Sequence, residues 1–355
     1  MLRAARRRAR TAIPTPAAPT TRPALRPAPA GVPPAAGVPA IRAVGVGKTY
    51  PGGVVAVDRL DLTVGQGELF GFLGPNGAGK TTTIAMMCTL ARPTSGRIEV
   101  AGYDTRTAPG QVRRRLGLVF QESTVDGELT AAENLRFHAD LYALPTATLP
   151  ARIAEMLALV GLTDRAGDLV RTFSGGLRRR LEIARGLLHR PRVLFLDEPT
   201  IGLDPQARER VWRHLTEVRE REATTLFLTT HYLDEAERCD RIAIIDSGRI
   251  IAQGTPAQLK AVLGADRVHL RTGDDALAAA AIRDRFGLVA DIGPDGLSVP
   301  AQDGARLVPR LCAGLDVPVH AVSVTRPSLD DVFLHHTGNR IRSDQPAAAA
   351  VGEAP

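Results

Sequence analysis

From Ile41 onwards, short apolar runs alternate with longer segments in which apolar residues recur at helical spacing. Four short runs have the length and composition of buried strands, at residues 69–73, 192–196, 225–229 and 241–245. One longer segment follows Asp204 and Pro205, which suit a helix N-cap and first turn, and its apolar face carries Ala207, Val211, Leu215 and Val218. Strands that alternate with helices in this way predict an α/β fold.

Two further segments extend this α/β core. Residues 122–172 contain no convincing strand and are predicted to be a helical insertion. After about residue 265 the pattern indicates a smaller unit, with strands at 268–272, 289–292, 297–300 and 319–325 and helices at 275–286 and 306–315. This βαββαβ order is ferredoxin-like. We expect a large domain over residues 41–262, with a helical subdomain at about 122–180, and then a small α+β domain over residues 263–340.

The two ends of the chain have a different composition. Residues 1–40 are mainly Ala, Pro and Arg with almost no bulky side chains, so they cannot bury enough apolar surface to offset the entropy of ordering. We expect disorder over residues 1–40 and over residues 341–355. The Arg-rich start lacks acidic residues, as transit peptides do, but a solvated extension or a start codon placed too early explains it as well.

Charge and cysteine spacing exclude several classes of protein. The net charge of +7 lies within the first 40 residues, which contain seven Arg and no Asp, Glu or Lys. The neutral remainder disfavours specific nucleic-acid binding, because phosphate contacts need clustered cations, although a basic tail that binds anionic lipid or nucleic acid stays an alternative. The cysteines are spaced for neither disulfides nor zinc: Cys88, Cys239 and Cys312. No run approaches the roughly 18–20 apolar residues that cross a bilayer.

A glycine-rich loop lies between the predicted strand at 69–73 and a helical segment that begins near Thr82. It matches the pattern GxxxxGK[ST] with Gly74, Pro75, Asn76, Gly77, Ala78, Gly79, Lys80 and Thr81. Such glycines let backbone N–H groups surround phosphates, and the helix N-terminus adds a favourable dipole. We expect Lys80 to bridge the β- and γ-phosphates and Thr81 to offer its hydroxyl to Mg²⁺. The alternative, a chance glycine-rich turn before a lysine, does not explain the strand–loop–helix context.

Two adjacent carboxylates end the apolar run at 192–196. An unpaired charge beside a buried strand is costly, so Asp197 and Glu198 indicate a function. Asp197 is expected to hold the Mg²⁺ shell, and Glu198 to polarise the attacking water as general base. With the phosphate loop, this pair predicts a P-loop nucleotide hydrolase.

A third motif narrows this class. The run TFSGGLRRRLEIARGLLHRPRVLFLDEPTIGLD at residues 172–204 resembles the nucleotide-binding domain of ATP-binding cassette (ABC) transporters, and the resemblance covers roughly residues 41–260. It implies a RecA-like core with a helical subdomain and an antiparallel β edge. Ser174, Gly175 and Gly176 match the family's signature, whose helix N-terminus faces the γ-phosphate of the ATP held by the opposite subunit. The resemblance therefore implies a homodimer that binds ATP at two composite sites.

Other positions match the family's motifs in order. The resemblance assigns Tyr50 to adenine stacking, Gln121 to the Q-loop that contacts Mg²⁺ or water, Asp204 to the D-loop at the dimer interface, and His231 to the γ-phosphate. With Thr82, these residues complete the implied ATP site, and Lys80, Gln121, Glu198 and His231 form its catalytic set.

Two departures from the family pattern stand out, together with one run of arginines. Leu177 replaces the usual glutamine of the signature, and Ile201 replaces a smaller residue before the D-loop glycine. Neither removes a phosphate donor, so we expect competent sites. Residues 178–180, all Arg, are interpreted as a solvated helix face rather than as ligands.

The run SGGLRRRLEIA and the motif LDDVFLHHTG at residues 329–338 are similar to the daunorubicin-resistance type of ABC ATPase. This implies efflux of a drug, antibiotic or related hydrophobic compound through a separate permease of the ABC-2 type, at the cytoplasmic face of a bacterial membrane. For LDDVF, an amphipathic helix packed on its own small domain and a dimer or permease contact are equally good interpretations. An importer ATPase with a regulatory C-terminal domain, and a non-transport ABC protein acting on DNA or ribosomes, are the alternative functions.

Overall fold

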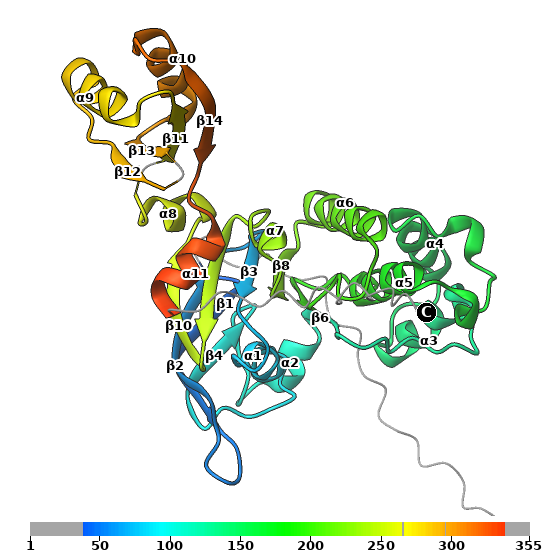
Figure 1. The fold of residues 1–355 in the computed structure, drawn as a ribbon. Coiled ribbons are helices and arrows are strands. Elements are labelled where there is room, and N and C mark those ends of the chain that lie inside the picture. Colours follow the sequence, from blue (N-terminus) through cyan, green and yellow to red (C-terminus); the bar gives the residue numbers. More distant parts are fainter. Residues whose placement is uncertain (1–37, 265, 295, 338–355) are drawn as a thin grey trace, which may run out of the picture. The chain divides into compact units, whose positions relative to one another are not determined.

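The computed structural model describes residues 38–264, 266–294 and 296–337 (Figure 1). The predicted extension up to residue 37 and the predicted tail at 341–355 lie outside these ranges. Ala40, at the end of the predicted extension, is instead buried, and its N–H donates to the carbonyl of Val64 at 2.9 Å. The reason is that strand β1 begins at the next residue and is already paired with β2 there.

A six-stranded sheet forms the centre of the large domain, in the order β10-β9-β3-β8-β7-β6. Its strands are β3 (Leu69–Leu73), β6 (Leu116–Val119), β7 (Val193–Asp197), β8 (Thr225–Thr230), β9 (Arg241–Asp246) and β10 (Arg249–Gly254). All neighbours pair in parallel except β9 and β10. The four strands expected from apolar runs are therefore confirmed to within one residue at each end.

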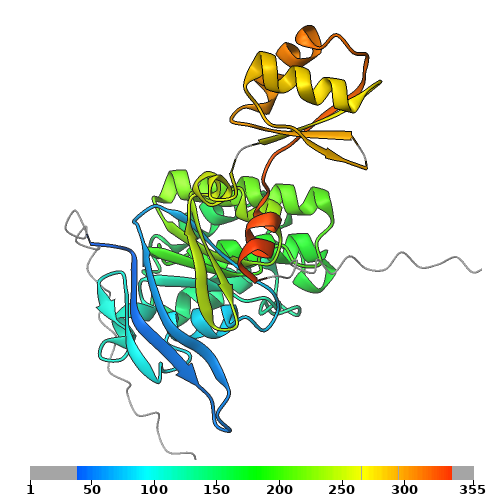
Figure 2. The same cartoon turned by 60° about the vertical axis from the view of Figure 1, so that its left-hand side comes forward.

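Side chains of the central strands alternate between two cores. Phe195 and Phe227 pack in one core, whereas Leu194 and Leu226 pack in the other. The first core is closed by α1 (Lys80–Met87) and by an antiparallel sheet of β1 (Ile41–Thr49), β2 (Val55–Val64), β4 (Ser95–Val100) and β5 (Tyr103–Asp104), whose long strands appear in Figure 2. Burial on both faces is typical of parallel strands that are apolar throughout.

Helices close the second core. These include α3 (Ala131–Leu141), α4 (Leu149–Leu159), α5 (Gly175–Leu187) and α6 (Pro205–Glu222), with the 3-10 turns η1 (Thr163–Arg165) and η2 (Val170–Thr172). Figure 1 shows α3, α4 and α5 gathered together. As predicted, residues 122–172 form no strand, apart from one isolated bridge between Thr130 and Leu169. Short helices α2 (Pro109–Arg113), α7 (Leu233–Ala236) and α8 (Pro256–Ala261) complete the domain.

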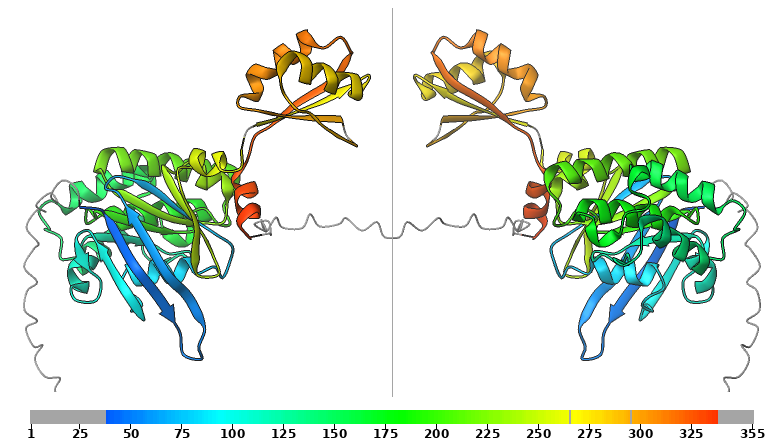
Figure 3. Two further views of the ribbon diagram at one scale, coloured as in Figure 1. Left: turned by 90° about the vertical axis from the view of Figure 1, so that its left-hand side faces the viewer. Right: turned by 90° about the vertical axis from the view of Figure 1, so that its right-hand side faces the viewer.

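The predicted βαββαβ order is confirmed after residue 265. The elements are β11 (Asp266–Thr272), α9 (Asp275–Phe286), β12 (Asp291–Gly293), β13 (Gly296–Ala301), α10 (Gly304–Gly314) and β14 (Val319–Thr325). The strands pair antiparallel in the order β12-β13-β11-β14, which is the ferredoxin-like arrangement, and enclose a core of their own with the two helices. Figure 3 shows both helices on one side of this sheet.

The helix that carries LDDVF, α11 (Leu329–Thr337), does not pack on this small core. Leu329, Val332 and Phe333 are buried in the second core of the large domain, and α11 lies against α8. Of the two interpretations of LDDVF, packing on its own small domain is therefore wrong, because the apolar face of the helix is used by the preceding domain. Within the described residues, no helix combines the length and apolar character needed to cross a membrane.

Candidate nucleotide site

The phosphate loop joins β3 to α1. Gly77 and Gly79 have φ values of 82° and 104°, which only glycine adopts readily, and Gly79 is the N-cap of α1. A Cβ on Gly74 would lie 2.4 Å from the carbonyl oxygen of Ile245, so the loop is closely enclosed. The helix begins at Lys80, two residues before the expected start near Thr82, and its first N–H groups have no partner within the helix. The loop thus has the form of an anion site.

Three predicted catalytic side chains meet beside this loop. Lys80 Nζ lies 3.1 Å from Oε1 of Glu198, and Nδ1 of His231 lies 3.2 Å from Oε2 of the same carboxylate. Lys80 also donates to the carbonyls of Gly74 at 2.8 Å and Pro75 at 3.1 Å. All three are buried, each with at most 6% of its surface exposed. Motifs that lie far apart in the sequence therefore converge, because the parallel strands β3, β7 and β8 end at the same edge of the sheet and α1 begins there.

The charge of Glu198 is stabilised by these neighbours. Burial alone would raise the pKa of the carboxyl, but the hydrogen bond with His231 and the positive charge of Lys80 outweigh it, so the pKa of Glu198 lies below its usual value. A carboxylate that stays ionised is the form that accepts a proton from water.

The signature residues form the exposed start of α5. Ser174 is its N-cap, and the side-chain oxygen accepts from the N–H of Leu177 at 3.4 Å. Ser174 and Gly175 are exposed, and Gly176 is half-buried. Across the described part of the chain, no hydrogen bond or ion pair joins these three residues to Lys80, Glu198 or His231. The signature residues are thus not part of the cluster that Lys80, Glu198 and His231 form in the same chain.

Comparison with known proteins identifies the family. The family model described as ABC transporter matches residues 57–201. The chain is 42% identical to the daunorubicin resistance ATP-binding protein DrrA3 of Streptomyces coeruleorubidus, over 87% of this chain and 99% of that one. It is 43% identical to the daunorubicin/doxorubicin resistance ATP-binding protein DrrA of Streptomyces peucetius, over 84% and 93%. The chain belongs to the ABC transporter ATP-binding proteins of the daunorubicin-resistance type.

Solved structures agree with this family. The fold matches the dimeric post-hydrolysis state of the ATP-binding cassette MJ0796 bound to ADP and Pi, with a TM-score of 0.56 and 27% identity, over 61% of this chain and 98% of that one. The chain is thus a nucleotide-binding ATP hydrolase, as the resemblance in its sequence implied.

Behind the acidic residues of this ABC protein lies a threonine that the sequence analysis did not single out. Thr229 on β8 is paired in register with Asp197 on β7. Its hydroxyl donates to Oδ1 of Asp197 at 2.5 Å and accepts from the N–H of Glu198 at 3.0 Å. The strand contains three threonines, Thr225, Thr229 and Thr230, so choosing Thr229 among them required the strand register.

A buried carboxylate, Glu235 on α7, was also missed. It accepts from the hydroxyl of Thr200, from that of Thr230 at 2.6 Å and from Nε1 of Trp212 at 3.4 Å. Burial raises the pKa of Glu235, and these hydrogen bonds partly offset the effect. Since Thr200 follows the acidic pair and Thr230 precedes His231, Glu235 joins two loops of the site.

The interpretation of residues 178–180 as a solvated face is wrong for Arg179. Its side chain is buried, with 6% of its surface exposed, whereas Arg178 and Arg180 are half-buried. The physical reason is that the guanidinium of Arg179 has carbonyl acceptors on the loops beneath α5, which the helical pattern alone does not reveal.

The remaining predicted residues lie at the ends of elements. Tyr50 is 39% exposed, with Lys48 Nζ 4.9 Å from its ring centre. Gln121 is exposed just beyond β6. Asp204 caps α6, as predicted, by accepting from the N–H of Ala207 at 2.8 Å.

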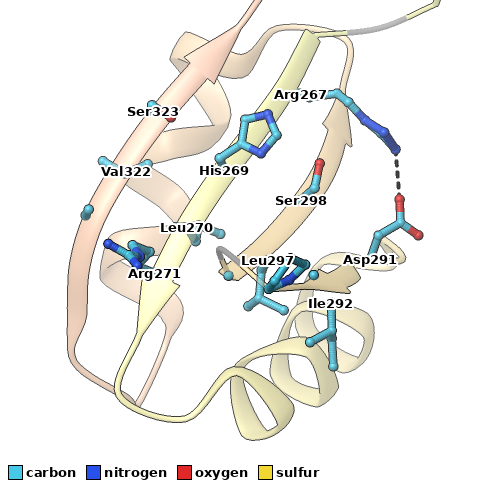
Figure 4. A pocket seen from close by; sticks show the side chains of 14 residues that line it. Arg267, His269, Leu270, Arg271, Asp291, Ile292, Leu297, Ser298, Val322 and Ser323 are labelled. Carbon is cyan, nitrogen blue, oxygen red and sulfur yellow. Dashed lines mark hydrogen bonds and ion pairs between the residues drawn. The ribbon is translucent and has the colours of Figure 1, made fainter.

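A separate pocket of about 610 Å³ lies on the small ferredoxin-like sheet. Arg267, His269 and Arg271 occupy alternate positions along β11, with Ser298 on β13 beside them (Figure 4). An ion pair of 2.8 Å joins Arg267 to Asp291. None of the predicted nucleotide-site residues lines this pocket.

Proposed function

We propose that this ABC subunit powers efflux of a drug, antibiotic or related hydrophobic compound through a separate transmembrane permease of the ABC-2 type. The subunit acts as a homodimer at the cytoplasmic face of the bacterial cell membrane, in contact with the membrane through the permease. Relatives of similar length whose names state daunorubicin or doxorubicin resistance support this proposal.

The proposed ATP site is built from two copies. The loop from Gly74 to Thr82 holds the phosphates of one ATP, Tyr50 stacks on its adenine, and Asp204 lies at the dimer interface. Ser174, Gly175 and Gly176 of the other copy face the γ-phosphate. Support for sharing between copies comes from the exposed start of α5, whose capping serine and backbone N–H groups have no anion partner among the residues that the structure describes.

The observation that carries the proposed chemistry is the contact of Glu198 with both Lys80 and His231. Glu198 accepts the proton of the attacking water, Lys80 binds the transferred phosphoryl oxygens, and His231 stabilises the charge that develops on them. When Lys80 turns to the phosphate, its ion pair with Glu198 breaks, and the carboxylate of Glu198 then accepts from the attacking water.

The residues around Asp197 suit Mg²⁺. Magnesium prefers oxygen ligands, and Asp197, Thr81 and Gln121 offer a carboxylate, a hydroxyl and an amide oxygen. Thr229 occupies Oδ1 of Asp197 and so orients the carboxylate with Oδ2 left for a ligand. When bound, the ion would neutralise phosphate charge during transfer.

Two substitutions test this function in the complex with the permease. Lys80→Ala is expected to abolish ATP turnover by removing the phosphate contact. Glu198→Gln keeps the shape of the side chain but lowers turnover by roughly 10²–10⁴-fold. In the subunit purified without the permease, it traps an ATP-bound dimer that elutes earlier than the monomer in size-exclusion chromatography. Glu220→Gln, an exposed change on α6, is the matched control.

Wild-type turnover in Lys80→Ala would refute the proposed phosphate loop, and wild-type turnover in Glu198→Gln would remove Glu198 as the base. Export is tested separately with inverted membrane vesicles, to which ATP and a fluorescent anthracycline probe are added from outside. ATP-dependent accumulation that is lost in Glu198→Gln supports efflux, whereas ATP turnover without accumulation contradicts it for this class of compound.

A further inference from the structure

Arg179 uses every N–H donor of its guanidinium. Nε donates to the carbonyl of Pro199 at 2.7 Å. Nη2 donates to the carbonyls of Asp197 at 2.9 Å and Glu198 at 3.1 Å. Nη1 donates to the carbonyl of Phe120 and to Oε2 of Glu182 at 3.1 Å. An arginine has five such donors, so none is left over for solvent.

Four of these five acceptors are backbone carbonyls at the edge of the proposed site. Three belong to the consecutive residues 197–199, which we call the acidic turn. The fourth is the carbonyl of Phe120, the residue directly before Gln121. The guanidinium therefore spans two loops that approach the nucleotide from different strands, β6 and β7.

Glu182 provides the charge that makes burial of Arg179 possible. Only 1% of its surface is exposed, and its other oxygen accepts from the N–H of Thr124 at 2.7 Å. Burial lowers the pKa of Arg179, and the charge of Glu182 opposes this shift. A buried ion pair whose remaining donors are all hydrogen-bonded is held in one geometry.

The acidic turn needs such support because its backbone is strained. Glu198 has a φ of 45°, in the left-handed region that non-glycine residues rarely adopt. A conformation of this kind persists only where its surroundings impose it. Arg179 contacts the carbonyls of Glu198 and of both its neighbours, so it fixes the segment that carries the carboxylate.

We infer that Arg179 is a positioning residue for ATP hydrolysis, which holds the acidic turn and the start of the Q-loop in the arrangement that catalysis requires. This inference rests on the proposed role of Glu198 as base. Since Arg179 lies on α5, five residues after Ser174, the helix that presents the signature to the partner subunit also sets the catalytic loop of its own subunit. Arg179 reaches the acidic turn and the Q-loop only through their backbone carbonyls, so it acts on the catalytic side chains through the backbone that carries them.

Three variants of the full chain, purified with the permease, test this role. Arg179→Lys keeps the charge beside Glu182 but offers only three donors, and Arg179→Met offers none. Arg179→Met with Glu182→Gln also removes the buried unpaired carboxylate, and so separates stability from positioning. Arg178→Met is the matched control, because within the described part of the chain the half-buried Arg178 makes a single side-chain hydrogen bond, to the carbonyl of Arg171.

A displaced catalytic group lowers kcat without weakening substrate binding. We expect kcat for ATP to fall by about a hundredfold in Arg179→Met and in the double variant, with KM and the Kd for ATP within about twofold of wild type. The melting temperature should fall in Arg179→Met and recover in the double variant. Arg179→Lys should give an intermediate kcat, and Arg178→Met should match the wild type.

Wild-type kcat in a folded Arg179→Met or double variant, with Glu198→Gln inactive, would overturn the inference and leave the proposed function standing. Recovery of kcat together with melting temperature in the double variant would also overturn it, since it would show that Arg179 only stabilises the fold. Full activity in Glu198→Gln would instead refute the proposed base.

Discussion

The two hydrogen bonds that Thr229 makes to Asp197 and Glu198 should contribute measurably to the free energy of unfolding. Thr229→Val keeps the shape of the side chain and removes the hydroxyl that donates to Asp197 at 2.5 Å and accepts from Glu198 N–H at 3.0 Å. A hydrogen bond to a charged group contributes about 1.5–3 kcal/mol, and a buried N–H left without a partner costs about 1–3 kcal/mol. Thr229 is fully buried and Asp197 nearly so, so water cannot replace the hydroxyl.

The two effects share one oxygen and are not independent, so we expect a loss of about 2–4 kcal/mol in total. In a domain of this size each kcal/mol lowers the melting temperature by about 2–4 °C, which gives a fall of roughly 5–15 °C. Thermal and urea denaturation of the full chain measure this. Thr229→Ser is the control, because it keeps both hydrogen bonds and loses one methyl group, at a cost of about 1 kcal/mol. If Thr229→Ser proved less stable than Thr229→Val, methyl packing rather than hydrogen bonding would hold the two strands, and the reasoning would fail.

Two further predictions concern the phosphate loop and the helical subdomain. Gly74→Ala places a Cβ 2.4 Å from the backbone oxygen of Ile245, so it should lower stability by about 1–3 kcal/mol and weaken ATP binding in a fluorescent-nucleotide titration, whereas Gly110→Ala, with open space around it, should change neither. Burial lowers the pKa of His138 and of His189 to about 4 from 6.5, so the unfolded chain binds more protons between these values and stability falls as pH drops from 6.5 to 4. Denaturation at several pH values should give a loss of roughly 3 kcal/mol per histidine between pH 6.5 and pH 4, and His189→Phe should lessen the slope; an unchanged slope would show that His189 is not responsible.

The fold was largely predictable because its strands are buried on both faces. Runs such as residues 193–196 and 226–228 are apolar throughout, and this makes the positions of their strands evident without knowledge of the neighbouring strands. The phosphate loop was predictable for a different reason, since its glycines and lysine are needed at fixed spacing. The location of helix α11 was not predictable, because its apolar face could pack against any nearby core. Only the folded chain shows that it packs against α8 and the second core of the large domain.

The departure at Leu177 illustrates what a motif does and does not determine. Its N–H donates to the hydroxyl of Ser174, a contact that any residue except proline can make through its backbone. Its side chain is partly buried against the second core, where a leucine gains more than a glutamine. The expectation that this substitution removes no phosphate donor therefore has a structural basis, although the competence of the site stays a prediction.

Two of the residues that sequence reasoning missed share a physical property. Thr229 and Arg179 act largely on backbone N–H and carbonyl groups of the acidic turn, and every sequence supplies those groups. The side chains of the turn therefore do not indicate which residues bind its backbone. Motifs identify the atoms that meet phosphate and water, whereas the groups that hold those atoms in place emerge only from strand register and helix packing. This division explains why a run of three arginines contains one buried member: Arg179 alone lies over the carbonyls that Glu198 and its neighbours present in their strained turn.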